Sequence, residues 1–311
     1  MLKVAAVVPP ASKNLGNDFF SLGGIEAFKQ TYAHVEKEIT YIEFFDSGEK
    51  GFGNGRTAFF TQATLDWIRD EADVVVLFGG CCLHNNLRHL FEPLLATGTP
   101  FIGWGLSPTT YDQNDVNFAK EIADKSFALI TRDDIIAKNV GEYNNFMSGM
   151  DGGWWMGDSY TKPSKTSEYL LVNIEKGGVL DRGESGKAYN TLKAQTKSPV
   201  HIISNNCERG DHFNDSRCFL ITSAKHLYTT IANSTFIVTT RAHSTICALT
   251  NGVEVEYLGI RDCRVDGLMA TVGVNLSDEL DAAEVVEKVK NAKAKFIADV
   301  ADRFDITKLI K

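Results

Sequence analysis

The sequence predicts an α/β protein with two parallel-sheet domains of similar size that face each other across a cleft. Three observations lead to this prediction. Short β-branched runs alternate with helical patterns over most of the 311 residues, the runs are apolar on both faces, and the alternation is interrupted once, near residues 144–168. Strands that are apolar on both faces are typical of a parallel sheet covered by helices on two sides.

The first half contains five apolar runs separated by helical patterns. The expected strands are residues 3–9, 40–46, 73–80, 100–106 and 127–132. The expected helices are residues 21–35, 57–72, 87–98 and 115–126. Gly98 is the predicted stop of the third helix, because glycine commonly follows the last helical turn.

A second alternating series follows the interruption. Its expected strands are residues 169–174, 200–205, 235–240 and 253–259. Its expected helices are near residues 186–196, 217–232 and 243–250, and one or two amphipathic helices follow Ser277 as N-cap. The interruption is rich in Gly, Asn, Ser and Thr, which favours a connection between domains. We therefore predict a Rossmann-like N-terminal domain (1–150), a linker (151–168) and a Rossmann-like C-terminal domain (169–311).

The composition excludes several classes of protein. The formal net charge is −8, which argues against a general nucleic-acid-binding surface. No apolar stretch approaches the roughly 20 residues that span a bilayer, and no signal peptide is visible. Six cysteines occur without a CxxC pair or zinc-finger spacing. We expect a cytoplasmic protein with reduced thiols, no metal site and no integral membrane segment, as a monomer or an oligomer.

The loops after the strands are where a ligand is expected, because ligands of open parallel sheets bind beyond the carboxyl ends of strands. The first such loop contains Asn14, Asn17 and Asp18. These residues either form a turn with an N-cap or line the cleft. After the third strand, Gly79 and Gly80 allow a close approach of a helix or of a ligand.

His84 and Asn85 follow these glycines, where a helix is expected to begin. His84 is either a structural histidine or a catalytic one. Arg132 ends the fifth strand and is followed by two aspartates. It is either the salt-bridged start of a helix or an anion-binding residue.

The segment VTTRAHSTICAL (238–249) places Arg241 and His243 where a strand gives way to a helix. Helix N-termini bind anions through free N–H groups, and a guanidinium adds bidentate recognition of phosphate or carboxylate. An imidazole beside them can transfer a proton near neutral pH. Together with Arg132 and His84, these residues predict a pocket for a small, doubly anionic ligand. No Walker loop, dinucleotide fingerprint, HExxH or GxSxG motif occurs.

At these residues the chain resembles the polysaccharide pyruvyl transferase family. The resemblance is carried by NLGND (14–18), by DVVVLFGGCCLHNN (73–86) with PFIGWGLSP (100–108), by SFALITRDD (126–134) with MDGG (150–153), and by IVTTRAHSTICAL (237–249). Such enzymes have two Rossmann-like halves resembling the GT-B glycosyltransferases. They transfer pyruvyl from phosphoenolpyruvate to two hydroxyls of a sugar as a cyclic ketal, without a further cofactor.

The resemblance implies roles for individual residues. Donor binding would involve Arg132, Arg241, Ala242, Gly79 and Gly80. His243 and His84 would be catalytic, with His243 the candidate general acid. The acceptor side would include the residues Asn14, Asn17, Asp18, Asn85 and Asp151. The implied partners are phosphoenolpyruvate and a sugar acceptor, either an oligosaccharide or a lipid-linked glycan.

Two other functions remain open from the sequence. One is a GT-B glycosyltransferase that uses a nucleotide sugar, in which Arg241 and helix N-termini would hold a diphosphate. The other is a binding protein that kept the fold without turnover.

Overall fold

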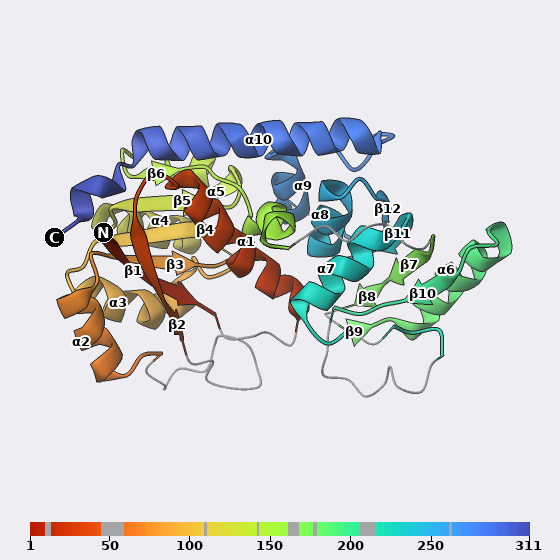
Figure 1. Cartoon of the computed structure of the whole chain (residues 1–311), viewed down its shortest axis with the longest axis horizontal. Helices are drawn as coiled ribbons and strands as arrows, with labels where there is room; N and C mark the ends of the chain where they lie inside the picture. The colour runs from red at the N-terminus through yellow and green to blue at the C-terminus, as the bar shows by residue number, and fades with distance from the viewer. Residues whose placement is uncertain are drawn as a thin grey trace. The chain divides into compact units, whose positions relative to one another are not determined.

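The computed structural model describes residues 1–9, 14–44, 59–108, 111–141, 143–160, 168–176, 179–205, 216–219, 221–260 and 263–311 (Figure 1). The chain forms two compact units. The first unit contains residues 1–10, 24–152 and 294–311, and the second contains residues 11–23 and 153–293. The first unit therefore includes residues 294–311, which were predicted in the C-terminal domain. The second unit includes residues 11–23, which were predicted in the N-terminal domain.

The first unit is built on a six-stranded sheet in the order β2-β1-β3-β4-β5-β6, and every neighbouring pair is parallel. The strands are β1 (Leu2–Val8), β2 (Lys37–Glu43), β3 (Val74–Phe78), β4 (Phe101–Leu106), β5 (Ala128–Thr131) and β6 (Phe146–Met147). The chain places β2 on one side of β1 and all later strands on the other side. The carboxyl ends of β1 and β3 thus form the topological switch point of this sheet.

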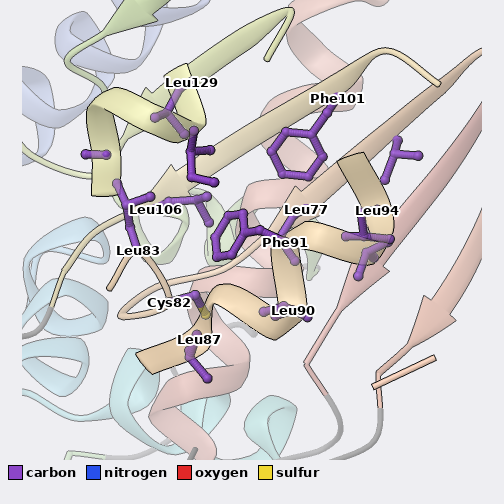
Figure 2. Packing of buried hydrophobic residues seen from close by; sticks show 14 of the residues in the cluster. Leu77, Cys82, Leu83, Leu87, Leu90, Phe91, Leu94, Phe101, Leu106 and Leu129 are labelled. Carbon is purple, nitrogen blue, oxygen red and sulfur yellow. The ribbon is translucent and has the colours of Figure 1, made fainter. Parts of the chain in front are cut away.

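Helices cover both faces of the first sheet. The elements on one face are α2 (Gln62–Glu71), the 3-10 helix η1 (Asn85–Leu87), α3 (Arg88–Ala96), α4 (Gln113–Lys125) and α5 (Ile135–Val140). Figure 2 shows Leu87, Leu90 and Phe91 from η1 and α3 among the residues of this core. On the other face, Phe28 of α1 (Leu15–Thr31) and Phe296 of α10 (Ala282–Arg303) contact Trp104 edge to face.

The second unit contains a four-stranded parallel sheet in the order β10-β7-β11-β12. Its strands are β7 (Leu170–Asn173), β10 (Val200–Ile202), β11 (Phe236–Thr239) and β12 (Glu254–Tyr257). The helices of this unit include α6 (Arg182–Gln195), α7 (Ala224–Asn233), α8 (Ala242–Thr250) and α9 (Cys263–Ala270). The chain order reverses between β7 and β11, so the carboxyl ends of these two strands form the switch point of the second sheet.

A short antiparallel hairpin leaves the end of β7. It pairs β8 (Glu175–Lys176) with β9 (Val179–Leu180), and Glu175 is the register partner of Leu180. The apolar run predicts one continuous strand ending at residue 174, and the hairpin was not predicted. Four other elements were not predicted either: β6, α5, α9 and η4 (Ile306–Leu309).

The segment predicted as a linker is in part a buried element. Residues Gly152–Ser159 form the 3-10 helix η2, and Trp154 and Trp155 are fully buried. Residues 161–167 of the predicted linker lie outside the described ranges. The composition of this stretch suggested a connection between domains, but its two tryptophans carry enough apolar area to favour burial.

The predicted fold class is confirmed, because both sheets are parallel and each lies in an α/β unit. Among the described helices none is long and apolar enough to cross a membrane. Cys81, Cys82, Cys218 and Cys247 are free thiols. Within the described ranges no group of three or more His, Cys, Asp or Glu side chains could hold a metal ion.

Candidate functional site

Arg241 lies at the switch point of the second sheet. It lies one residue beyond β11, after Thr240, and takes the N-cap position of α8 with extended backbone, so the strand-to-helix transition predicted from VTTRAHSTICAL is confirmed. Its side chain is 23% exposed. A guanidinium at this place can therefore reach a ligand while its stem is anchored in the protein.

A buried polar network supports Arg241. We call it the Arg241 cluster, and its members are Asn173, Glu175, Asn205, Thr239, Arg241 and Ser244. Thr239 accepts a hydrogen bond from the Arg241 backbone N–H over 3.0 Å and donates to Asn173 Oδ1, also over 3.0 Å. The Ser244 hydroxyl lies 2.9 Å from the same Asn173 oxygen and 3.1 Å from Asn205 Oδ1. Every member except Arg241 is buried, so these bonds hold the strand ends in one arrangement.

His243 is the second residue of α8 and lies in its first turn. Its ring packs against the rings of Phe19 and Phe20 of α1, with centroids 6.4 and 5.9 Å away. These contacts fix the imidazole from one side. A histidine held in this way at the start of a helix is suited to transfer a proton to or from a bound ligand.

The first turn of α1 lies against the Arg241 cluster. The Leu15 backbone N–H donates to the Asn205 carbonyl over 2.8 Å. A Cβ added at Gly16 would come within 3.1 Å of Asn205 Nδ2 and 3.3 Å of His243 Cβ, which is closer than ordinary contact. Gly16 therefore permits the loop to approach His243. The structure thus brings the NLGND segment and the Arg-x-His segment together within one unit.

Asn14, Asn17 and Asp18 have different local partners. Asn14 Oδ1 accepts the Gly16 N–H over 3.2 Å, and the Asn14 carbonyl accepts the Asn17 N–H, so Asn14 closes the start of α1. Asp18 contributes to the raised pKa of Tyr160, which is due first to burial. The helix begins six residues earlier than predicted, because contacts with Asn205 order residues that the composition suggested were a turn.

Arg132 lies in the first unit between two buried carboxylates. We call Tyr111, Arg132, Asp133 and Asp151 the Arg132 cluster. Arg132 Nε is 3.7 Å from Asp133 Oδ2, and Nη1 is 3.8 Å from Asp151 Oδ2, with both carboxylates fully buried. These separations are longer than direct hydrogen bonds. Among the described residues, no atom accepts a hydrogen bond from Arg132 Nε.

Asp133 is positioned by two further hydrogen bonds. Tyr111 donates its hydroxyl to Asp133 Oδ2 over 2.7 Å, and the Ile135 N–H donates to Oδ1. Burial raises the pKa of Asp133, while Tyr111 and the guanidinium of Arg132 act against that shift. Tyr111 has a φ of 57°, a left-handed conformation that is uncommon for a residue other than glycine.

Asp151 reaches Arg132 because the chain after β6 runs close to β5. A Cβ at Gly149 would collide with the Thr131 carbonyl oxygen and the Ile130 side chain. Only glycine fits at this place, so the close approach that brings Asp151 to Arg132 is encoded in the sequence.

The loop after β3 holds Gly79, Gly80, His84 and Asn85. A Cβ at Gly79 would lie 3.1 Å from both Cys82 Sγ and Leu106 Cδ2, so this glycine accommodates neighbouring side chains of its own unit. The Gly80 carbonyl accepts the N–H groups of Cys82 and Ser107. Cys82 and Leu83 are anchored in the core of Figure 2, which fixes where the loop ends.

His84 precedes η1 and is half-buried. Burial lowers the pKa of His84, and Asp115 partly opposes this change. The neutral imidazole is thereby favoured. Asn85 is exposed, and its Oδ1 accepts two hydrogen bonds from Arg88, whose guanidinium is paired with Glu121 at 2.6 Å. Asn85 therefore has a clear structural partner.

Four residues of the two clusters were not predicted as site residues: Glu175, Asn173, Asn205 and Tyr111. A signal was present for the first two, because Asn173 and Glu175 come at the end of the apolar run LLV. Polar residues at that point of a parallel strand are expected at the ligand-binding edge. Asn205 carries the same signal, because it ends the expected strand 200–205. Nothing local marks Tyr111, whose contacts arise only in the folded chain.

The comparison with family models decides which family this chain resembles. The model described as polysaccharide pyruvyl transferase matches residues 14–258, a range that includes NLGND, the glycine-rich loop, Arg132 and the Arg-x-His segment. This chain belongs to the polysaccharide pyruvyl transferase family. The family resemblance predicted from the four motifs is thereby confirmed. No curated protein matches the chain.

Solved structures resemble this pyruvyl transferase family member in fold. The UDP-GlcNAc 2-epimerase from Methanocaldococcus jannaschii is 12% identical, with a TM-score of 0.57 over 95% of this chain and 93% of the other. The UDP-GlcNAc 2-epimerase from Neisseria meningitidis, bound to UDP-GlcNAc, is 10% identical, with a TM-score of 0.57 over 99% and 97% of the two chains. At these identities the likeness shows the GT-B-like fold alone.

Proposed function

We propose that this protein transfers the pyruvyl group of phosphoenolpyruvate to two hydroxyls of a sugar, forming a cyclic ketal. The observation that carries the proposal is the placement of Arg241 and His243 at the switch point of the second sheet. There, the partly exposed guanidinium belongs to the N-cap residue of α8, and the imidazole lies in the first turn of the same helix. Membership of the pyruvyl transferase family supports the same reaction.

The chemistry of the donor fits these residue types. Phosphoenolpyruvate carries a phosphate and a carboxylate, and the guanidinium of arginine suits both groups. We propose that Arg241 and Arg132 contribute to donor binding, with the backbone at Ala242 and the Gly79–Gly80 loop. His84, whose pKa is lowered by burial, is proposed as a further donor contact.

The proposed reaction is balanced without a further cofactor. His243 delivers a proton to the methylene carbon of phosphoenolpyruvate, which becomes a methyl group and leaves C2 with oxocarbenium character. A sugar hydroxyl attacks C2, its proton passes to the phosphate, the C2–O bond to phosphate breaks, and inorganic phosphate leaves. The second hydroxyl then attacks C2 and returns a proton to His243, which closes the ketal ring.

The acceptor is proposed to be a sugar of an oligosaccharide or of a lipid-linked glycan. Asn14, Asn17 and Asp18 are proposed acceptor contacts, because this segment adjoins His243 through Gly16. Asp151 and Asn85 remain candidates for the same role, although each has a partner of its own within the first unit.

The test is a product assay. The protein is incubated with phosphoenolpyruvate and a panel of oligosaccharides and lipid-linked glycans. Phosphate release is followed together with the mass of the acceptor. The expected product has gained one pyruvate less one water. Arg241→Ala should abolish donor binding, whereas His243→Asn should preserve donor binding and reduce turnover.

Two results would contradict the proposal. A rise in melting temperature with UDP or CDP but not with phosphoenolpyruvate would favour a nucleotide-sugar transferase. Binding of phosphoenolpyruvate without phosphate release on any acceptor of the panel would favour a binding protein.

A further inference from the structure

Glu175 places a buried carboxylate beside Arg241. Its side chain is 1% exposed, and its Oε2 lies 3.4 Å from Arg241 Nε. The residue follows β7, the strand next to β11, so the two side chains meet because their strands are neighbours at the switch point. An ionised carboxylate that is buried to this degree requires a cationic partner.

The two oxygens of Glu175 have different environments. Oε1 is 2.8 Å from the donating hydroxyl of Ser204, 2.6 Å from the Asn205 N–H and 3.4 Å from Asn173 Nδ2. Oε2 accepts no hydrogen bond from any described residue. The carboxylate is thus held through one oxygen, and the other oxygen is directed at Arg241.

The backbone of Glu175 is also fixed to the start of the Arg-x-His segment. The Thr240 hydroxyl accepts the Glu175 N–H over 2.8 Å and donates to the Glu175 carbonyl over 2.9 Å. Thr240 directly precedes Arg241. Movement of Glu175 relative to Arg241 is therefore opposed by both the main chain and the side chain.

Arg241 keeps most of its donors available. A guanidinium has five N–H donors, and among the described residues none of those of Arg241 is used in a hydrogen bond. The ion pair with Glu175 engages the Nε side. The two terminal nitrogens, which form the fork that recognises phosphate or carboxylate, have no partner in the part of the chain that the structure describes, so they can receive a ligand.

We infer that Glu175 is a positioning residue that holds the guanidinium of Arg241 in the orientation that binds the anionic donor. An arginine side chain has many rotamers, and fixing one of them before the ligand arrives removes part of the entropic cost of binding. The identity of the donor rests on the proposed function, whereas the coupling between Glu175 and Arg241 rests on their contact alone.

The first experiment is a double-mutant cycle on phosphoenolpyruvate binding and turnover. Glu175→Gln keeps the size of the side chain but removes its charge. It should raise the KM for phosphoenolpyruvate roughly 10- to 100-fold, the effect of coupling between contacting residues, with a smaller change in kcat. The same substitution in an Arg241→Lys background should have a much smaller effect. The inference is overturned if Glu175→Gln raises KM equally in both backgrounds or leaves it unchanged.

Matched variants separate positioning from general damage. Glu184→Gln removes an exposed carboxylate of the same unit, paired with Lys187 on the surface of α6, and should leave the KM unchanged. Glu175→Asp keeps the charge with a shorter side chain and should give a KM between those of the parent protein and Glu175→Gln. A KM for Glu175→Asp above that of Glu175→Gln would contradict a role for the charge.

A second cycle tests the pair without any ligand. Urea unfolding is measured for the parent protein, Glu175→Gln, Arg241→Ala and the double variant. Arg241→Ala leaves the buried carboxylate without its cation, so adding Glu175→Gln should recover part of the lost stability. Strict additivity would overturn the inference. If phosphoenolpyruvate fails to bind the parent protein but this cycle shows coupling, the proposed donor is wrong and the positioning role stands.

Discussion

The side chains of Thr239 and Asn173 are hydrogen-bonded across the central strand pair of the second sheet. The two residues are register partners on β11 and β7, and Thr239 Oγ1 donates to Asn173 Oδ1 over 3.0 Å. The same hydroxyl accepts the N–H of Arg241. Thr239 therefore links the end of β11 to the end of β7 and to Arg241, the N-cap residue of α8.

Replacing Thr239 by valine should destabilise the fold. The substitution keeps the shape of the side chain but leaves Asn173 Oδ1 without one donor and the Arg241 N–H without its acceptor. A loss of about 1–3 kcal/mol in the free energy of unfolding is expected for such buried groups, measured by urea denaturation. Thr222→Val, on an exposed residue before α7, should change the same free energy by less than about 0.5 kcal/mol.

Gly16→Ala should separate activity from stability. Alanine favours a helix by up to about 1 kcal/mol over glycine, and Gly16 lies in the first turn of α1. The added methyl would press on Asn205 and His243. Turnover should therefore fall severalfold while the melting temperature changes little. Gly186→Ala in α6 is the control, because its Cβ would meet only Arg217 at an ordinary 3.7 Å. An active Gly16→Ala variant would show that His243 tolerates displacement.

His84 should make stability depend on pH. Burial lowers the pKa of His84 below the ordinary histidine value of about 6.5, so the unfolded chain binds the proton more tightly than the folded protein does. The stabilisation is complete above pH 6.5 and is lost as the pH falls through the lowered folded-state pKa. Unfolding free energies measured between pH 8 and pH 5 should decline less steeply for His84→Asn than for the parent protein. Thr222→Val, on an exposed residue without a titrating side chain, should leave the decline unchanged.

Arg132 should be important for folding as well as for the proposed donor binding. Its replacement by leucine leaves the carboxylates of Asp133 and Asp151 buried without their shared cation. A loss of about 3–5 kcal/mol is expected, as for other broken buried ion pairs. Asp151→Asn added to Arg132→Leu should recover part of that loss in urea denaturation. If Arg132→Leu alone were as stable as the parent protein, the two carboxylates would have to be protonated or solvated.

The alternation of apolar runs and helical patterns was sufficient to predict both sheets. It failed where tertiary contacts outweigh composition. Asn14 to Asp18 looked like a turn, but the bond from Leu15 to Asn205 extends α1 through them. The Gly- and Ser-rich stretch after residue 150 looked solvated, but Trp154 is fully buried there. The missed strands β6, β8 and β9 are two residues long and too short for periodicity to detect.

The residues of the site could be predicted where they lie at the carboxyl ends of expected strands. Arg132 and Arg241 were found because they come at the ends of apolar runs, and His243 because it lies two residues after Arg241. Glu175 also follows an apolar run, but its contact with Arg241 could not be predicted, because it depends on β7 lying next to β11 and local sequence does not specify the order of the strands. The functional roles of these residues remain predictions, and the variants described above test them.

The β8–β9 hairpin carries Glu175, although it is not part of either parallel sheet. If Glu175 orients Arg241, changes in this hairpin would alter donor affinity while the Arg-x-His segment kept its sequence. Protein engineers could exploit this separation. A small library randomised at Lys176 and Leu180 could be screened for variants that bind phosphoenolpyruvate analogues more tightly. Such a screen would explore donor preference without altering any residue proposed to perform the chemistry.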